Sequence, residues 1–267
     1  MDLGLRDRVA LVTGASRGIG AAIAERLHGE GCRLALLARD QTHLDTLANR
    51  MTGSHAPEVF VRSCDVTSAD QCASAVAETL QRFGRVDIAV NNAGGADSFS
   101  PFHELTDDQF RKTWELNVLS AVRIIRAVLP GMRAHKWGRI INISSESAVQ
   151  PDPIGADYNS AKGALNTLTK TLSKAYAADG ILVNTVSPAF TLTPLLRAFI
   201  QRTATDQSIT FDEAQAAMLK NFRPHIEVRR PGKPEEVAAV VAFLASELAS
   251  FVNGADLRVD GGSVASV

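Results

Sequence analysis

Short apolar runs alternate with helical stretches along the whole chain, and this alternation constrains the fold more than any other feature. Each run is nearly continuously apolar, as in strands that are buried on both faces of a sheet. Such strands, joined by helices, form parallel sheets. The sequence therefore predicts an α/β protein with a single-domain, doubly wound Rossmann fold, in which helices cover both faces of a parallel seven-stranded sheet. The expected strands lie at residues 8–13, 33–38, 58–62, 86–90, 139–143, 181–186 and 255–259.

We expect residues 1–267 to form one domain, because no linker, repeat or low-complexity segment interrupts the alternation. One helix should be unusually long, over roughly residues 107–135, with a kink or a break at Leu129 and Pro130.

The segment of about residues 190–230 is too long for a simple loop, and it follows the sixth strand, at the edge where such sheets bind ligands. Two groups of apolar residues predict two helices, which we interpret as a lid with an apolar underside. The alternative is that these residues pack on the body of the protein or on a neighbouring subunit. The groups are Leu195, Leu196, Phe199 and Ile200, and Ala214, Ala217, Met218 and Phe222.

Composition narrows the classes of protein. The net charge of -1 gives no basic or acidic surplus for nucleic acid or a membrane surface. No stretch of about 18 apolar residues predicts a transmembrane helix, and the first residues do not resemble a signal peptide. Cys32, Cys64 and Cys72 lack the spacing of metal ligands, so we expect reduced thiols, no metal site and a cytoplasmic protein.

A glycine-rich turn joins the first strand to the first helix. Gly14, Gly18 and Gly20 permit a tight turn and a close approach of the backbone to a ligand, and the start of a helix attracts pyrophosphate. The alternative is a purely structural strand-to-helix turn. The context of strand, turn and helix favours a domain that binds NAD(P).

The end of the second strand bears on which dinucleotide is bound. An acidic residue there would accept a bond from the ribose 2′-hydroxyl, but Ala38 occupies the position and Arg39 follows it. Arg39 and Arg17 would suit a 2′-phosphate, whereas the nearby Asp40 argues against one. Arg39 could also be a simple solvated charge. We favour NADP(H) over NAD(H), and we expect Asp65 either to contact the adenine or to cap a turn.

Tyr158 and Lys162 are four residues apart in a predicted helix, so their side chains should lie on one face. A phenol has a pKa of about 10, and a nearby ammonium group favours the phenolate. The pair therefore has the chemistry of a general acid/base. An exposed pair that arises by chance is the alternative.

Further motifs make the chain resemble the short-chain dehydrogenase/reductase family, in the branch of the 3-oxoacyl-(acyl-carrier-protein) reductases. The resemblance runs from Arg8 to about Ser263. It includes the glycine turn of residues 13–20, the pair Asp65 and Val66, the segment 91–94, and a serine, Ser145, thirteen residues before Tyr158.

The resemblance implies four catalytic residues. Tyr158 would exchange a proton with the substrate oxygen, and Ser145 would polarise that oxygen. Lys162 would contact the nicotinamide ribose and lower the pKa of Tyr158, while Asn117 would hold a proton-relaying water. Ser144 would be a packing residue. The candidate cofactor-binding residues are Gly14, Ser16, Arg17, Gly18, Ile19, Gly20, Arg39, Asp65, Val66, Asn92, Ala93, Gly94, Tyr158, Lys162, Pro188, Thr191 and Thr193.

One position departs from the family. Ala189 follows Pro188 where the family usually has glycine, so the loop beside the nicotinamide is expected to differ slightly. After the catalytic serine, Glu146, Gln150 and Asp152 could line the pocket or be solvated loop residues.

The expected function is that of an NADP-dependent oxidoreductase that transfers hydride between the nicotinamide and a ketone or secondary alcohol, with a 3-oxoacyl thioester as one candidate. The alternative is a non-catalytic NADP-binding regulatory protein. A basic patch for a carrier protein is not obvious, because the arginines and lysines near residues 126–139 are scattered. The expected partners are a small carbonyl or alcohol substrate and further copies of the chain, in a homotetramer or homodimer.

Overall fold

The computed structural model describes residues 2–96 and 99–266 and contains one parallel sheet of seven strands. Their order, β3-β2-β1-β4-β5-β6-β7, places the first strand near the middle, so the chain winds outward in both directions. The predicted doubly wound fold is confirmed. The strands are β1 (Val9–Thr13), β2 (Arg33–Ala38), β3 (Val59–Ser63), β4 (Ile88–Asn91), β5 (Gly138–Ile143), β6 (Ile181–Pro188) and β7 (Asp256–Val259).

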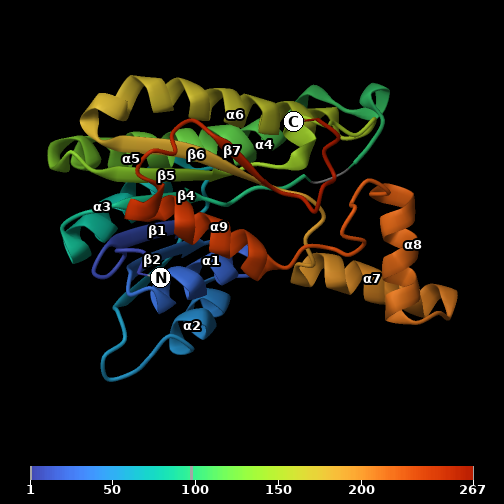
Figure 1. Cartoon of the computed structure of the whole chain (residues 1–267), viewed down its shortest axis with the longest axis horizontal. Helices are drawn as coiled ribbons and strands as arrows, with labels where there is room; N and C mark the ends of the chain where they lie inside the picture. Colours follow the sequence, from blue (N-terminus) through green and yellow to red (C-terminus); the bar gives the residue numbers. More distant parts are fainter. Residues whose placement is uncertain (1, 97–98, 267) are drawn as a thin grey trace.

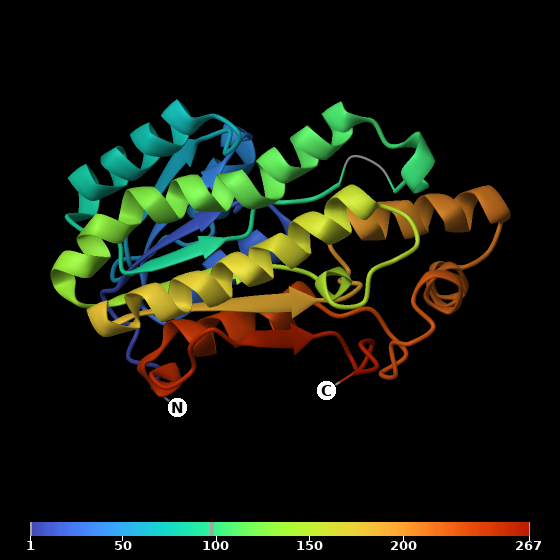
Figure 2. The ribbon, with the colours of Figure 1, turned by 90° about the horizontal axis from the view of Figure 1, so that it is seen from above.

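Helices cover both faces of the sheet (Figures 1 and 2). On one face lie α1 (Gly18–Gly29), α2 (Gln41–Asn49) and α9 (Pro234–Ala245). The other face carries α3 (Ala69–Phe83), α4 (Asp107–Trp114), α5 (Ser120–His135) and α6 (Ala156–Tyr176).

The apolar runs are continuous because each strand serves two cores. In β1, Val9 and Leu11 pack with the helices α3, α5 and α6, whereas Ala10 and Val12 pack with α1, α2 and α9. All four side chains are fully buried. Alternate residues of a strand point to opposite faces, so these four positions of β1 are apolar on both faces.

The long helix expected over residues 107–135 is interrupted at a different place from the one predicted, Leu129 and Pro130. A π-helical turn, Glu115–Leu119, separates α4 from α5, and α5 continues through Pro130 without a break. The proline lies close to the end of α5, where the loss of one backbone bond affects only the last turns. π-turns of this kind are frequent at functional sites, and this one carries Asn117.

The segment after β6 contains the two expected helices, α7 (Pro194–Gln207) and α8 (Phe211–Phe222). They extend beyond the carboxyl end of the sheet, at the right of Figure 1. Their buried residues, which include Ile200 and Met218, form a small core between the two helices. Leu195, Phe199 and Phe222 lie outside this core and are more than half exposed, so their place on the underside of a lid stays a prediction.

No helix in the described residues has both the length and the apolar character needed to cross a membrane.

Candidate active site

The glycine turn lies at the carboxyl end of β1, where the backbone has no room for side chains. Gly14 and Gly18 have φ angles of 64° and 60°, which favour glycine. A Cβ atom on Gly20 would stand 2.2 Å from the carbonyl oxygen of Gly14. The start of α1 is therefore pressed against the turn, as the close approach of a dinucleotide backbone requires.

Asn92 holds this turn in place from the end of β4. Its side-chain amide donates to the carbonyl oxygens of Thr13 and Gly14 at 2.9 and 3.1 Å. The hydroxyl of Thr13 in turn accepts from the backbone amides of Asn92 and Ala93. The segment predicted to lie beside the cofactor thus supports the glycine turn directly.

The start of α1 fits the pyrophosphate of a dinucleotide. Arg17 is its N-cap, no side chain in the described residues caps the helix, and its first turn contains no acidic residue. The first amides of α1 are therefore available to an anion. Ser16 and Ile19 are half-buried in the same turn, and Thr193, at the start of α7, lies within 3.3 Å of where a Cβ of Gly18 would stand.

The region at the end of β2 fits a 2′-phosphate. Arg17 and Arg39 are exposed, and within the described ranges neither guanidinium forms an ion pair. Asp40, which argued against a phosphate, caps α2: its carboxylate accepts from the backbone amide of His43 at 3.0 Å and contacts the His43 ring. The bond from that amide lowers the pKa of Asp40. The carboxylate of Asp40 is therefore bonded to residues of α2.

Asp65 at the end of β3 caps a turn, which was one of its two expected roles. One oxygen accepts from the backbone amide and the hydroxyl of Thr67, at 2.9 and 2.8 Å. These bonds hold the pKa of Asp65 below its usual range. The neighbouring Val66 is buried, and the contact of either residue with adenine stays a prediction.

Ser145 and Tyr158 meet at the carboxyl end of β5. Ser145 begins the short 3₁₀ turn Glu146–Ala148, and its hydroxyl donates to that of Ser147 at 3.1 Å. The same hydroxyl lies beside the phenol of Tyr158, in the first turn of α6, and lowers the pKa of that phenol. Phe99 packs edge-to-face on the Tyr158 ring, with 5.9 Å between the ring centres. The two hydroxyls can therefore contact the same oxygen atom of a substrate.

Lys162 lies one turn further along α6, under the ring of Tyr158. Its ammonium nitrogen is 5.5 Å from the ring centre and donates to the carbonyl oxygen of Ile143 at 2.9 Å. Lys162 is only 3% exposed, and burial lowers its pKa to about 8. Ser144, expected to be a packing residue, donates to the backbone oxygen of Lys162.

The expected effect of Lys162 on the pKa of Tyr158 stays a prediction. Burial raises the pKa of Tyr158, and the groups that oppose this rise are the Ser145 hydroxyl and the charge of Arg223. The nitrogen of Lys162 is held at the Ile143 carbonyl, 5.5 Å from the centre of the Tyr158 ring.

Asn117 is fixed in the π-turn beside Gly94 and Gly95. Its side-chain nitrogen donates to the oxygens of Gly95 and Thr113, and its oxygen accepts from the Gly95 amide at 3.0 Å. A Cβ atom on Gly94 would lie 2.7 Å from Asn117 and 3.1 Å from the Lys162 nitrogen. The structure therefore brings Asn117, Gly94 and Lys162 together, as the motifs predicted.

The loop after β6 accommodates Ala189 without strain. Ala189 is not among the described non-glycine residues with positive φ, so the position does not require glycine. Pro188 pairs with Val259 of β7, and Thr191 forms an isolated parallel bridge with Gly232. This bridge fixes the first residues of the segment that leads to α7.

Sequence analysis missed one residue, Arg223, at the end of α8. Its guanidinium forms ion pairs with Glu146 at 2.6 Å and with Asp152 at 2.6 Å. Glu146 and Asp152 had been considered only as pocket or loop residues, and no local pattern links them to a residue about 70 positions away. Gln150, the third loop candidate, instead bonds the backbone of Ser263 and Ala265.

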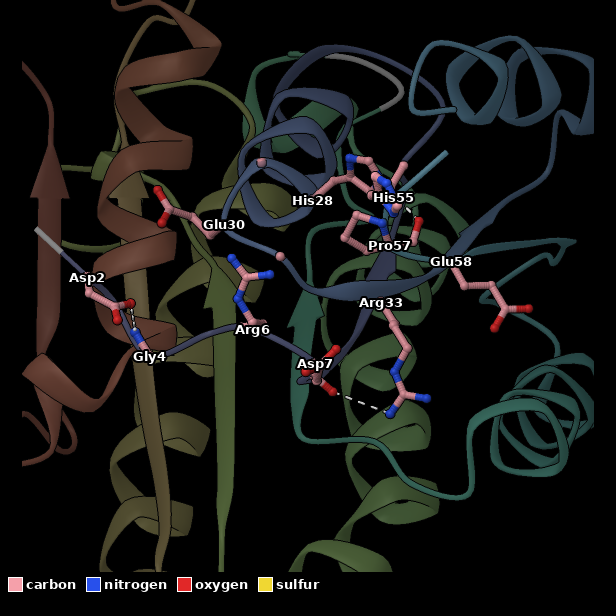
Figure 3. A pocket seen from close by; sticks show the side chains of 13 residues that line it. Asp2, Gly4, Arg6, Asp7, His28, Glu30, Arg33, His55, Pro57 and Glu58 are labelled. Carbon is pink, nitrogen blue, oxygen red and sulfur yellow. Dashed lines mark hydrogen bonds between the residues drawn. The ribbon is translucent and has the colours of Figure 1, made fainter. Parts of the chain in front are cut away.

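A hollow that contains none of the expected site residues lies at the opposite edge of the sheet. A groove of about 930 Å³ is formed by the segment before β1, the end of α1 and the loop before β3 (Figure 3). Charges of both signs line it, among them Asp2, Arg6, Arg33 and Glu58. It contains none of the residues predicted for the site. The described residues also contain no group of side chains that could hold a metal ion.

These features define a dinucleotide-dependent oxidoreductase, and comparisons with known proteins agree. Residues 14–264 match the family model described as enoyl-(acyl carrier protein) reductase. The chain is 35% identical to 2,3-dihydroxy-2,3-dihydro-p-cumate dehydrogenase of Pseudomonas putida, over 98% of this chain and 96% of that protein. It is also 35% identical to L-fucose dehydrogenase of Oryctolagus cuniculus, over 96% and 84% of the two chains.

A solved structure is similar over the full length of both chains. It is L-sorbose reductase from Gluconobacter frateurii, crystallised with NADPH and L-sorbose, which is 34% identical and superposes with a TM-score of 0.95. The chain belongs to the short-chain dehydrogenase/reductase family. It is an oxidoreductase that acts on the CH–OH group of its donors and uses a nicotinamide cofactor.

Substitution of Gly20 by alanine should abolish tight cofactor binding, because the added Cβ would collide with the backbone of Gly14. We expect the Kd for NADPH, measured by fluorescence titration, to rise by about a hundredfold or more. Gly29→Ala at the other end of α1 is the matched control, since nothing lies within 4 Å of its added Cβ. Equal affinities for the two variants would contradict the close packing of the glycine turn.

The stability of the cofactor-free protein should depend on pH through Lys162. Its pKa of about 8 lies below that of an unfolded lysine, about 10.4. The folded state therefore carries the cost of a buried ammonium below pH about 8 and loses that cost as the pH rises. Between pH about 7 and about 10, wild type should therefore gain about 2 kcal/mol of free energy of unfolding relative to Lys162→Met.

Chemical denaturation at a series of pH values measures this difference. Lys174→Met, on an exposed position of the same helix, is the control and should give no such shift. A pH-independent difference for Lys162→Met would show that Lys162 has the same pKa in the folded and unfolded protein.

Proposed function

We propose that the protein is an NADP(H)-dependent reductase of a ketone, or dehydrogenase of the corresponding secondary alcohol. The observation that carries this proposal is that the Ser145 hydroxyl lies beside the phenol of Tyr158, with the ammonium of the buried Lys162 5.5 Å from the centre of the same ring. A regulatory protein that only bound the dinucleotide would not need an acid, a hydroxyl donor and a buried ammonium in one place.

In this proposal, Ser145 donates a hydrogen bond to the substrate oxygen and orients the carbonyl. Tyr158 gives its proton to that oxygen during reduction and takes it back during oxidation. The nicotinamide, when bound, supplies or accepts the hydride. Lys162 and Asn117, which lie against Gly94, would hold the ribose side of the site and connect Tyr158 to solvent through a proton relay.

Two features support NADP(H) over NAD(H). Arg17 and Arg39 are exposed beside the ribose position, and neither is paired with an acid in the described chain. Asp40, the nearest acid in sequence, is occupied as the cap of α2. The crystallised L-sorbose reductase, similar over the whole chain, contains NADPH.

We propose a small polyhydroxylated substrate, of the size of a ketose or a sugar alcohol. Buried acceptors such as Glu146 beside Tyr158 suit a substrate with several hydroxyl donors. L-sorbose reductase and L-fucose dehydrogenase, two of the relatives, have names that indicate such substrates.

We also propose that α7 and α8 form a lid over this site, and that the chain assembles as a homotetramer in the cytoplasm. Support for the lid is its place at the carboxyl edge of the sheet (Figure 1). Support for assembly is the exposed apolar surface between α9 and β7, where Leu248 and Phe251 are 50% and 102% exposed.

Tyr158→Phe should lower kcat by about a thousandfold or more while leaving the Kd for NADPH within about twofold, because only the proton donor is lost. Tyr176→Phe is the matched control, since Tyr176 is the only other tyrosine and lies at the far end of α6. The assay follows NADPH consumption with L-sorbose, other ketoses, diketones and an acetoacetyl thioester. Full activity of Tyr158→Phe would refute the proposed mechanism.

Arg39→Gln should reduce the preference for NADPH over NADH by about tenfold to a hundredfold in kcat/KM, through a weaker interaction with the 2′-phosphate. Arg50→Gln, an exposed arginine at the end of α2, should leave the preference unchanged. If wild type prefers NADH, the roles proposed for Arg17 and Arg39 are wrong.

A further inference from the structure

One ion-pair cluster joins the end of α8 to the loop that carries Ser145. Arg223 is the C-cap of α8, and its Nε donates to Glu146 at 2.6 Å. Its two terminal nitrogens donate to the two oxygens of Asp152 at 3.0 and 2.6 Å. We call Arg223, Glu146 and Asp152 the lid–loop cluster.

The cluster lies close to the proposed proton donor. Glu146 follows Ser145 in the chain, and its side chain is only 3% exposed. The side chains of Arg223 and Asp152 are also largely buried, at 20% and 26% exposed. A bidentate bond between a guanidinium and a carboxylate fixes both distance and orientation. The cluster therefore holds α8 at a defined position relative to Ser145.

We propose that Arg223 is a positioning residue of the active site, which docks the lid onto the loop after Ser145 and brings a positive charge to Tyr158 only when the lid is docked. This inference rests on the proposed function, since it assigns a role in that same site. It concerns a contact between two elements that are far apart in sequence.

The charges around Tyr158 determine how docking of the lid would change the pKa of this tyrosine. Arg223 lowers the pKa of Tyr158, whereas Glu146 raises it. Two other charged side chains nearby have partners of their own. The ammonium of Lys162 donates to the carbonyl oxygen of Ile143, and the carboxylate of Asp157 accepts from the hydroxyl of Thr113.

Asp152 holds Arg223 in place through their ion pair. If the lid opens, Arg223 moves away and leaves Glu146 buried beside the phenol. The pKa of Tyr158 then rises, and the tyrosine becomes a weaker acid. Docking of the lid would thus strengthen the proton donor at the time when the substrate is enclosed, and would exclude water from the same site.

The test uses single substitutions that separate charge from docking. Because the chain has two tyrosines, a Tyr176→Phe background makes Tyr158 the only one, and ultraviolet difference absorbance then follows its ionisation. Arg223→Gln should raise the pKa of Tyr158 by about one unit, and Glu146→Gln should lower it by a similar amount. Asp152→Asn should raise it in the same direction as Arg223→Gln but by less, because Arg223 loses one of its two anchors. Arg202→Gln, whose arginine is 84% exposed on α7, should leave it unchanged.

Kinetics provide the second measurement. With a ketone that the enzyme reduces, the pH dependence of kcat/KM includes the ionisation of Tyr158. That part of the profile should move to higher pH for Arg223→Gln and to lower pH for Glu146→Gln. Arg223→Lys keeps the charge but not the bidentate bond, so its pH profile should stay near that of wild type while KM rises about tenfold. Asp152→Asn should likewise raise KM, and proteolysis within residues 190–230 should be faster in both variants.

The proposal would be overturned if Arg223→Gln and Glu146→Gln shifted the pKa of Tyr158 in the same direction, or if neither shifted it. A purely structural role predicts that outcome, because unfolding of the loop affects both variants alike. If Arg223→Gln does not fold, the Arg223→Gln, Glu146→Gln double variant removes the unpaired buried charge. Its tyrosine pKa should return to within about half a unit of wild type.

The two proposals can fail separately. Absence of turnover with every carbonyl compound would refute the proposed function, whereas the absorbance titration of Tyr158 needs no turnover and would still decide the role of Arg223.

Discussion

The proposed site depends on how α6 is fixed to the carboxyl end of β5. The ammonium group of Lys162 donates to Ile143, and the hydroxyl of Ser144 donates back to Lys162. One layer deeper, Asn142 of β5 donates to Thr169 of α6 and accepts from Asn91 of β4. These bonds are buried, so each is expensive to leave unmade. Together they set the position of the first turn of α6, and with it the meeting of Tyr158 and Ser145.

The sequence was sufficient for the fold because its signals are local. A strand buried on both faces is mostly apolar, and a glycine with positive φ at a strand-to-helix turn can be recognised without any tertiary contact. Gly14, Gly18 and Asn92 also lie where their motifs indicated, since the close packing of the turn leaves little choice of residue.

What the sequence did not reveal depends on contacts between distant segments. The π-turn at Glu115–Leu119 has no propensity signal, and it forms where Asn117 bonds Gly95. Arg223 meets Glu146 only because the chain returns from α8 to the loop after β5. The pKa of Tyr158 depends on that meeting and on burial, which spacing along one helix does not reveal.

The π-turn also limits how this chain can change in length. Each residue of a helix advances the following side chains by about 100°, so a turn with one extra residue rotates α5 relative to α4 by that amount. Loss of a single residue within Glu115–Leu119 would restore a regular helix and turn Asn117 away from Gly95. Families that descend from this chain should therefore gain and lose residues in surface loops, while the number of residues between Thr113 and Ser120 stays constant.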